Sequence, residues 1–313
     1  MPGEARPVNV DKYFVRRAVA LAVLVLAVVG GFSLVRAAFG GGGDGAAPPT
    51  TPTTAAGEPA PTSTNVGTVP ENTRTDNAAQ IARANVPVLC YHQVRPMTAS
   101  DSAAYVTEPS TLDDQLDAIK AAGYTTITLD QYVAHIKDGA TLPAKPILLT
   151  FDDGSEGHYT QVLPRLQERG MVATFFIMTV TLGNENWLTR EQVQELDAAG
   201  MSIGSHTWDH HDVTGLRTAK DFRTQLTEPR RTLEKLLGHP VTVLAYPFGL
   251  WNRSVVPHVE RAGYTSAFQL AEKADPRYPM HSIRRIAVGE ESGADLVRQI
   301  RGAFPATTPA LAS

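Results

Sequence analysis

Short apolar runs alternate with helical patterns along the chain between about residues 84 and 304. The apolar runs include PVLCY, TTITL, PILLTF, ATFFIM and VTVLAYP. Between them lie patterns such as LDDQLDAIKAAG and REQVQELDAAG, which end in glycine as helices often do. Strands and helices that take turns in this way predict an α/β domain with a parallel sheet surrounded by helices.

Four of the apolar runs end in polar motifs. They are YH at 91–92, TFDDG at 150–154, SHTWDHH at 205–211 and YPFG at 246–249. In folds of this kind the site is built by loops that leave the carboxyl ends of the strands. We therefore expect the four motifs to lie together.

The spacing of two histidines indicates a metal site. His206 and His210 are four residues apart, so one helical turn would place both imidazoles on one face. One carboxylate from TFDDG would complete an Asp-His-His set, which leaves a coordination position open as in catalytic zinc sites. Whichever aspartate of TFDDG does not bind the metal could then accept a proton from water. A solvated turn is the alternative for each motif taken singly.

The motifs resemble, in type and order, those of the polysaccharide deacetylases, the NodB-homology group of carbohydrate esterase family 4. The resemblance covers about residues 86–287 and implies a distorted (β/α) barrel of seven or eight parallel strands. It also implies that Asp153, His206 and His210 bind a divalent metal, zinc or alternatively cobalt or nickel. By the same resemblance Asp152 is the general base.

Two departures from the family pattern resemble one branch of it. Family members commonly have an arginine where this chain has Ala245, and a Leu-x-His motif that we do not find downstream of YPFG. The branch that deacetylates poly-N-acetylglucosamine shares both departures and has an early PVLxYH segment, here VPVLCYHQV. It implies that His92 is the general acid, with backbone capping as the alternative. Arg285 either replaces the missing arginine beside Asp152 or is a surface charge.

The YPFG motif is expected to contact the substrate. By the resemblance, the backbone N–H of Phe248 donates to the oxyanion. Tyr246 could offer a face to a sugar ring, with packing in the core as the alternative. His158 and His211 adjoin other motifs and are expected to be solvated neighbours.

The N-terminal part of the chain differs from the rest. An uncharged stretch over 18–35 follows Arg16 and Arg17, which predicts a transmembrane anchor over 18–39 with residues 1–17 in the cytoplasm. A cleaved signal peptide, and hence a secreted form, is the alternative. Residues 40–83 are rich in Gly, Pro, Thr and Ala and predict a disordered linker. The catalytic domain then spans 84–304, before a flexible tail over 305–313.

Composition excludes several classes of partner. The net charge of -4 gives no basic surface for nucleic acid, and the single cysteine, Cys90, excludes an intrachain disulfide and a cysteine-rich zinc site. The predicted function is that of a membrane-anchored, extracytoplasmic hydrolase. It would cleave the linear amide of N-acetylglucosamine units in a cell-surface polysaccharide. Peptidoglycan deacetylation, acetylxylan esterase activity and non-catalytic carbohydrate binding are the alternatives.

Overall fold

The computed structural model describes residues 71–270 and 273–305. The predicted cytoplasmic segment 1–17, the predicted anchor 18–39, most of the predicted linker and the tail from residue 306 lie outside these ranges. Within them, no helix has the length and apolar character needed to span a bilayer.

The predicted end of the linker at residue 83 is wrong, because Glu71–Arg83 form helix α2. This helix is tied to the domain by polar contacts. Asn77 Nδ2 donates to the carbonyl oxygen of Pro276 at 3.0 Å, and Arg83 Nη1 donates to that of Ile136 at 2.8 Å. A helix held by polar contacts does not require an apolar run in its sequence. Composition alone therefore did not distinguish this helix from the linker.

One parallel sheet forms the centre of the domain. Its strand order is β10-β1-β5-β6-β7-β8-β9, with β4 also paired to β5. A parallel bridge between Phe268 and Ile283 joins β9 to the segment that leads into β10, so the sheet curls back towards its first edge. The predicted distorted (β/α) barrel is confirmed. The strands are β1 (Val88–Tyr91), β4 (Thr125–Thr126), β5 (Pro146–Phe151), β6 (Thr174–Ile177), β7 (Ser202–Ser205), β8 (Val243–Ala245), β9 (Ser266–Phe268) and β10 (Ile286–Ala287).

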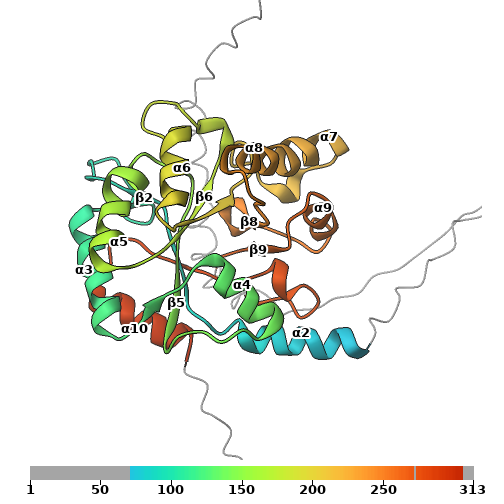
Figure 1. The fold of residues 1–313 in the computed structure, drawn as a ribbon, viewed down its shortest axis with the longest axis horizontal. Coiled ribbons are helices and arrows are strands. Elements are labelled where there is room, and N and C mark those ends of the chain that lie inside the picture. Colours follow the sequence, from blue (N-terminus) through green and yellow to red (C-terminus); the bar gives the residue numbers. More distant parts are fainter. Residues whose placement is uncertain (1–70, 271–272, 306–313) are drawn as a thin grey trace, which may run out of the picture. The chain divides into compact units, whose positions relative to one another are not determined.

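Helices surround the strands (Figure 1). Helices α3 and α10 pack on each other on one side. Several helices are defined by their ends: Thr128 and Thr189 form capping boxes, and Gly139 and Gly170 end helices in the left-handed conformation. The helices are α3 (Pro109–Ala121), α4 (Leu129–Asp138), α5 (Leu163–Arg169), α6 (Arg190–Ala198), α7 (Ala219–Phe222), α8 (Glu228–Leu237), α9 (Val256–Arg261) and α10 (Gly293–Ala303).

Alternation along the strands separates two apolar clusters. On β5, Leu149 and Phe151 belong to a large cluster that also includes residues of the outer helices, such as Leu116 of α3. Leu148 belongs to a second cluster, which contains Phe176 of β6 and Phe268 of β9. Successive side chains of a strand point to opposite faces, so this second cluster fills the interior of the barrel.

Candidate active site

The same alternation directs the candidate residues to the interior of the barrel at its carboxyl end. Leu148 faces the interior, so the next residues on that face are Thr150 and then Asp152. On β1, Val88 faces the interior, and the same face continues through Cys90 to His92. The strand ends therefore bring together side chains that lie far apart in the sequence.

Asp152 is held by a buried arginine. Arg285 donates from Nη1 to Oδ1 of Asp152 at 2.6 Å and from Nη2 to Oδ2 at 2.7 Å. The guanidinium is itself fully buried and also donates to Thr150 Oγ1 at 3.2 Å and to the carbonyl oxygen of Gln269 at 3.3 Å. The thiol of Cys90 lies 3.4 Å from Asp152 Oδ2. Arg285 is therefore the partner of Asp152, and the alternative that it is a surface charge is wrong.

These contacts determine the charge of Asp152. Burial alone would raise the pKa of this carboxyl, but the charge of Arg285, and then that of His206, holds the pKa well below its ordinary value. Asp152 is therefore an anion with a fixed orientation. Burial also raises the pKa of the Cys90 thiol, so Cys90 is a neutral neighbour.

Asp153 lies in a different environment and forms a second group with His206 and His210. Nε2 of His206 lies 3.5 Å from Asp153 Oδ1, and Nε2 of His210 lies 3.6 Å from the same oxygen. Asp153 and His210 both have positive φ, 82° and 62°, a conformation that costs energy in non-glycine residues. The backbone thus turns sharply at both positions where a side chain enters this group.

The second group fits a divalent metal ion. One potential ligand atom from each of its three residues lies within 4.8 Å of the others. Asp153 Oδ1 and His206 Nε2 are buried, and neither has a hydrogen-bond partner among the described residues. His206 Nδ1 contacts the carbonyl oxygen of Ala245 at 2.8 Å, which leaves Nε2 available to a metal, as is usual for ligating histidines. Two ligands about 2.0–2.1 Å from a tetrahedral zinc lie roughly 3.4 Å apart, close to the separations observed.

Electrostatics support the same interpretation. Burial, and next the neighbouring charge of Asp152, raise the pKa of Asp153 to about 7. A cation at this position would relieve both effects, because it favours the ionised carboxylate. The two adjacent aspartates therefore differ in their charge partners: Asp152 is paired with the guanidinium of Arg285, whereas Asp153 has no such cation beside it in the described part of the chain.

His92 lies beside Asp152. A potential ligand atom of His92 is within 4.8 Å of Asp152 and Cys90, and the ring of Tyr105 contacts the His92 ring edge-on at 5.4 Å. Burial lowers the pKa of His92 to about 4, although the charge of Asp152 acts in the opposite direction. The imidazole is therefore neutral at neutral pH in this structure.

His158 is fully buried, so the expectation that it is solvated is wrong. It begins the π-helix η1 (His158–Val162), and its Nε2 contacts the carbonyl oxygen of His92 at 2.7 Å. Its ring packs against Phe151 at 5.6 Å and Phe175 at 5.5 Å. The sequence around TFDDG does not predict this contact, because it arises only when η1 folds back onto the end of β1. His158 thereby fixes the backbone from which His92 projects.

The YPFG motif gives a mixed result. Phe248 has a positive φ of 60°, and its ring lies 4.4 Å from the ring of His210, so the motif adjoins the metal-ligand group. The prediction for the side chain of Tyr246 is wrong: its ring is buried in an apolar cluster, and its hydroxyl donates to the carbonyl oxygen of His281 at 3.1 Å. Tyr246 directly follows β8 and shares the outward face of Leu244, where both pack in one cluster with Val259 of α9.

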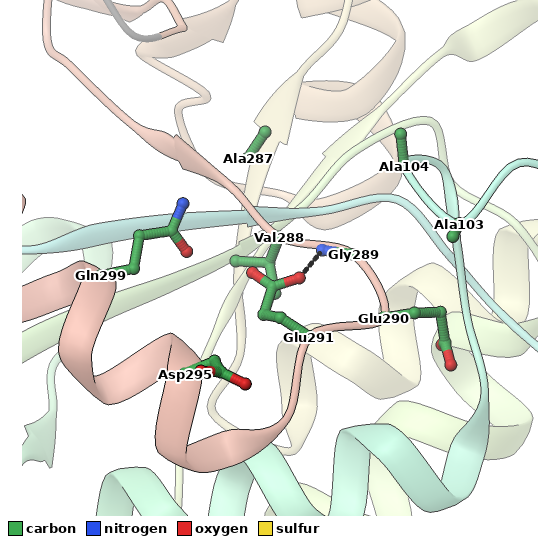
Figure 2. A pocket seen from close by; sticks show the side chains of 9 residues that line it. All are labelled: Ala103, Ala104, Ala287, Val288, Gly289, Glu290, Glu291, Asp295 and Gln299. Carbon is green, nitrogen blue, oxygen red and sulfur yellow. Dashed lines mark hydrogen bonds between the residues drawn. The ribbon is translucent and has the colours of Figure 1, made fainter.

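A hollow of about 600 Å³ is lined by other residues, among them Glu290, Glu291 and Asp295, and by none of the candidate site residues (Figure 2). Its acidic side chains have structural partners. Glu290 Oε2 accepts a hydrogen bond from Thr111 Oγ1 at 2.9 Å, and Glu291 Oε2 accepts one from the backbone N–H of Gly289 at 2.8 Å. The hollow therefore offers no group of the candidate site, and the candidate residues lie at the barrel mouth.

Comparison with known proteins finds a family match and several relatives. Residues 139–267 match the family described as Polysaccharide deacetylase. YxkH of Bacillus subtilis (strain 168), provisionally named a polysaccharide deacetylase, is 27% identical over 205 residues, which are 64% of this chain and 71% of that protein. The poly-beta-1,6-N-acetyl-D-glucosamine N-deacetylase of Staphylococcus aureus (strain MRSA252) is 25% identical over 239 residues, 68% of this chain and 82% of that protein.

Solved structures show the same fold. The Streptococcus pyogenes deacetylase PplD, in complex with acetate, superimposes with a TM-score of 0.63 at 24% identity, covering 69% of this chain and 97% of that one. IcaB from Ammonifex degensii superimposes with a TM-score of 0.59 at 24% identity, covering 69% and 97%.

Proposed function

Because the chain is a member of the polysaccharide deacetylase family, we propose that it is a metal-dependent enzyme that hydrolyses the acetamide of N-acetylglucosamine units in a poly-N-acetylglucosamine-like polysaccharide. The observation that carries the proposal is the opposed environment of two adjacent aspartates. Asp152 is paired with Arg285, whereas Asp153 faces His206 and His210 without a cation. The name of the Staphylococcus aureus relative supports the choice of substrate.

Asp153, His206 and His210 would hold the metal ion. Imidazole and carboxylate ligands suit zinc first, with cobalt or nickel as substitutes. When bound, such an ion would polarise the acetamide carbonyl and acidify the attacking water.

Asp152 acts as the general base in this proposal. It takes a proton from water as the water oxygen forms a bond to the carbonyl carbon. Arg285 keeps Asp152 ionised and holds both of its oxygens in place. The oxyanion that develops on the carbonyl oxygen receives a hydrogen bond from the backbone N–H of Phe248.

His92 acts as the general acid. Since the ring is neutral at neutral pH, it receives the proton that Asp152 has taken from water and passes it to the amide nitrogen. The bond between carbon and nitrogen then breaks, and the products are acetate and a free amine. The position of His92 within 4.8 Å of Asp152 supports this relay.

We also propose that the enzyme acts outside the cytoplasm and is anchored in the cell membrane. The uncharged stretch over 18–35, preceded by Arg16 and Arg17, supports this location. Fractionation of cells that express the full chain tests it: the protein is expected in the membrane fraction at its full mass. Full-length protein in the soluble fraction would contradict the anchor.

Acetate release from defined substrates tests the proposed function. The metal-loaded protein is incubated with β-1,6-linked N-acetylglucosamine oligomers, peptidoglycan and acetylxylan, each with and without a chelator. We expect release from the oligomers, loss with the chelator and recovery with zinc. Faster acetate release from peptidoglycan or acetylxylan than from the oligomers would show that one of these polymers is the substrate. Oligomer binding without any acetate release would indicate a non-catalytic carbohydrate-binding protein.

A further inference from the structure

Three large hydrophobic side chains are exposed in the described part of the chain, and all three adjoin the site. The exposed fractions are 39% for Tyr105, 38% for Trp208 and 44% for Leu250. Single exposed apolar residues are normal on any protein. Exposed apolar residues grouped around one site instead mark a surface that binds a partner.

Tyr105 lies on the β1 side of the site. Its ring meets the ring of His92 edge-on at 5.4 Å, and its carbonyl oxygen accepts a hydrogen bond from the backbone N–H of Gln93 at 3.0 Å. The next residue, Val106, begins strand β3 (Val106–Thr107), which pairs with β2 (Gln93–Val94). Two short strands therefore hold the Tyr105 ring beside His92.

Trp208 lies between the candidate ligands His206 and His210. Its backbone is fixed at both ends: its N–H donates to Gln225 Oε1 at 3.3 Å, and its carbonyl oxygen accepts from the N–H of Val180 at 2.9 Å. The loop backbone is thus fixed at Trp208, while the residue stays partly exposed.

Leu250 follows the YPFG motif and projects from a tightly packed turn. Its N–H donates to the carbonyl oxygen of Pro247 at 3.1 Å. A Cβ at the preceding Gly249 would lie 2.6 Å from the backbone nitrogen of Leu270, so the turn has no room to shift. Phe248 in the same turn contacts His210, which places Leu250 near the Trp208 loop.

The strand order sets these residues on opposite sides of the site. Along the path β1-β5-β6-β7-β8, Tyr105 belongs to the β1 end, and Trp208 and Leu250 belong to the loops after β7 and β8. The residues that carry the chemistry, Asp152 and Asp153, follow β5 between them. A polymer that crosses the site would therefore meet apolar side chains before and after the reacting unit.

We propose that Tyr105 on one side and Trp208 with Leu250 on the other bind the sugar rings that flank the reacting unit, so that the enzyme acts on interior units of a polysaccharide chain. This inference rests on the proposed function, because it takes the reacting unit to lie at Asp152 and Asp153. Sugar rings present apolar C–H faces that pack on aromatic and aliphatic side chains. The polar groups between the three residues suit a chain of polar sugars better than a lipid surface.

Binding of oligomers of different length tests the inference without relying on turnover. The zinc-loaded protein and the variants Tyr105→Ala, Trp208→Ala and Leu250→Ala are titrated by calorimetry with β-1,6-linked glucosamine oligomers of one and five units, which lack the acetyl group. Each variant is expected to bind the five-unit oligomer about tenfold more weakly, the effect of removing one buried apolar contact. The binding of the single unit should change much less.

Tyr278→Ala is the matched control, since Tyr278 is a half-buried aromatic in the segment before His281 and its ring contacts the guanidinium of Arg277. It should leave the preference for long oligomers intact. Unchanged five-unit binding in all three variants would overturn the inference, as would an equal loss for one and five units. Loss of binding to phosphatidylglycerol vesicles, with oligomer binding unchanged, would assign the three side chains to a membrane surface and also overturn it. Acetate release is measured separately, so absence of turnover with intact length-dependent binding would refute the proposed function alone.

Discussion

The two halves of the site are built around neighbouring aspartates that differ in almost every physical respect. On the Asp152 side, a buried guanidinium binds both carboxylate oxygens and lowers the pKa. On the Asp153 side, Oδ1 has no hydrogen-bond partner among the described residues and the pKa rises to about 7. A turn of the backbone, with φ of 82° at Asp153, separates the two. The first half has a cation from the chain itself, whereas in the proposed function the second half receives one from a bound metal ion.

The largest effect is expected from removal of a ligand on the Asp153 side. His206→Ala should lose both metal and activity, because it removes one of three protein ligands. We expect turnover to fall by about a thousandfold or more, since a catalytic metal contributes several kcal/mol to the transition state. Metal content by atomic absorption and acetate release are measured together. A His206→Ala enzyme with a full equivalent of metal would break the assignment of this half.

The next effect concerns the stability of the Asp152 side. Arg285→Met leaves the buried Asp152 carboxylate without its cation, which should destabilise the fold by about 3–5 kcal/mol. Urea denaturation of the metal-free protein measures this loss. The double variant Arg285→Met with Asp152→Asn should recover part of the stability, because the uncompensated charge is removed. A loss of the same size in the double variant would show that packing of Arg285 on Phe176 matters more than its charge.

Removal of the proposed acid should affect rate and leave the metal in place. His92→Ala is expected to lower turnover by about 10²- to 10⁴-fold, the usual contribution of a positioned proton donor. His281→Ala serves as the control, since the His281 ring contacts the carbonyl oxygen of Tyr264 at 3.5 Å and lies 3.9 Å from the carboxylate of Glu260. Wild-type turnover in His92→Ala, or a dead but metal-loaded His281→Ala, would transfer the acid role to another residue.

A smaller effect is expected at His158, which contacts the backbone carbonyl oxygen of His92. Burial lowers its pKa from 6.5 to about 4. Below pH 6.5 the unfolded chain therefore binds a proton that the folded chain does not, so this histidine reduces stability as the pH falls from 6.5 towards 4. His158→Phe should flatten that dependence, by at most about 1.4 kcal/mol per pH unit. Parallel denaturation curves at pH 7, 6 and 5 provide the comparison, and an unchanged slope would show that His158 is protonated in the fold.

The sequence predicts those parts of the molecule in which local patterns carry the information. Alternation of strand-like and helical patterns predicted the parallel sheet surrounded by helices, because each element is defined by nearby residues, and the family resemblance implied that this sheet is a distorted barrel. The inward direction of Asp152 follows from the period of two along β5, which places it on the face of Leu148. Strand ends that meet at one edge then account for the proximity of Asp153, His206 and His210.

Other features depend on contacts that no local pattern encodes. Arg285 is 133 residues from Asp152 in the chain, and its direction depends on the register of β10 against β1, so its role stayed open. Burial of His158 depends on the π-helix that folds back on β1. Tyr246 is an aromatic residue of the kind that binds sugars, yet it lies on the outward face shared with Leu244, where packing against α9 buries its ring. Helix α2 was missed because polar contacts hold it to the domain.

The division of labour between the two aspartates is tested most directly by a matched pair of variants. Asp152→Asn and Asp153→Asn are prepared in parallel, and zinc stoichiometry and acetate release from N-acetylglucosamine oligomers are measured on both. We predict that Asp152→Asn retains about one equivalent of zinc and loses turnover by about 10²- to 10⁴-fold, whereas Asp153→Asn loses zinc and turnover together. Equal zinc content in the two variants, or loss of zinc from Asp152→Asn alone, would contradict the account.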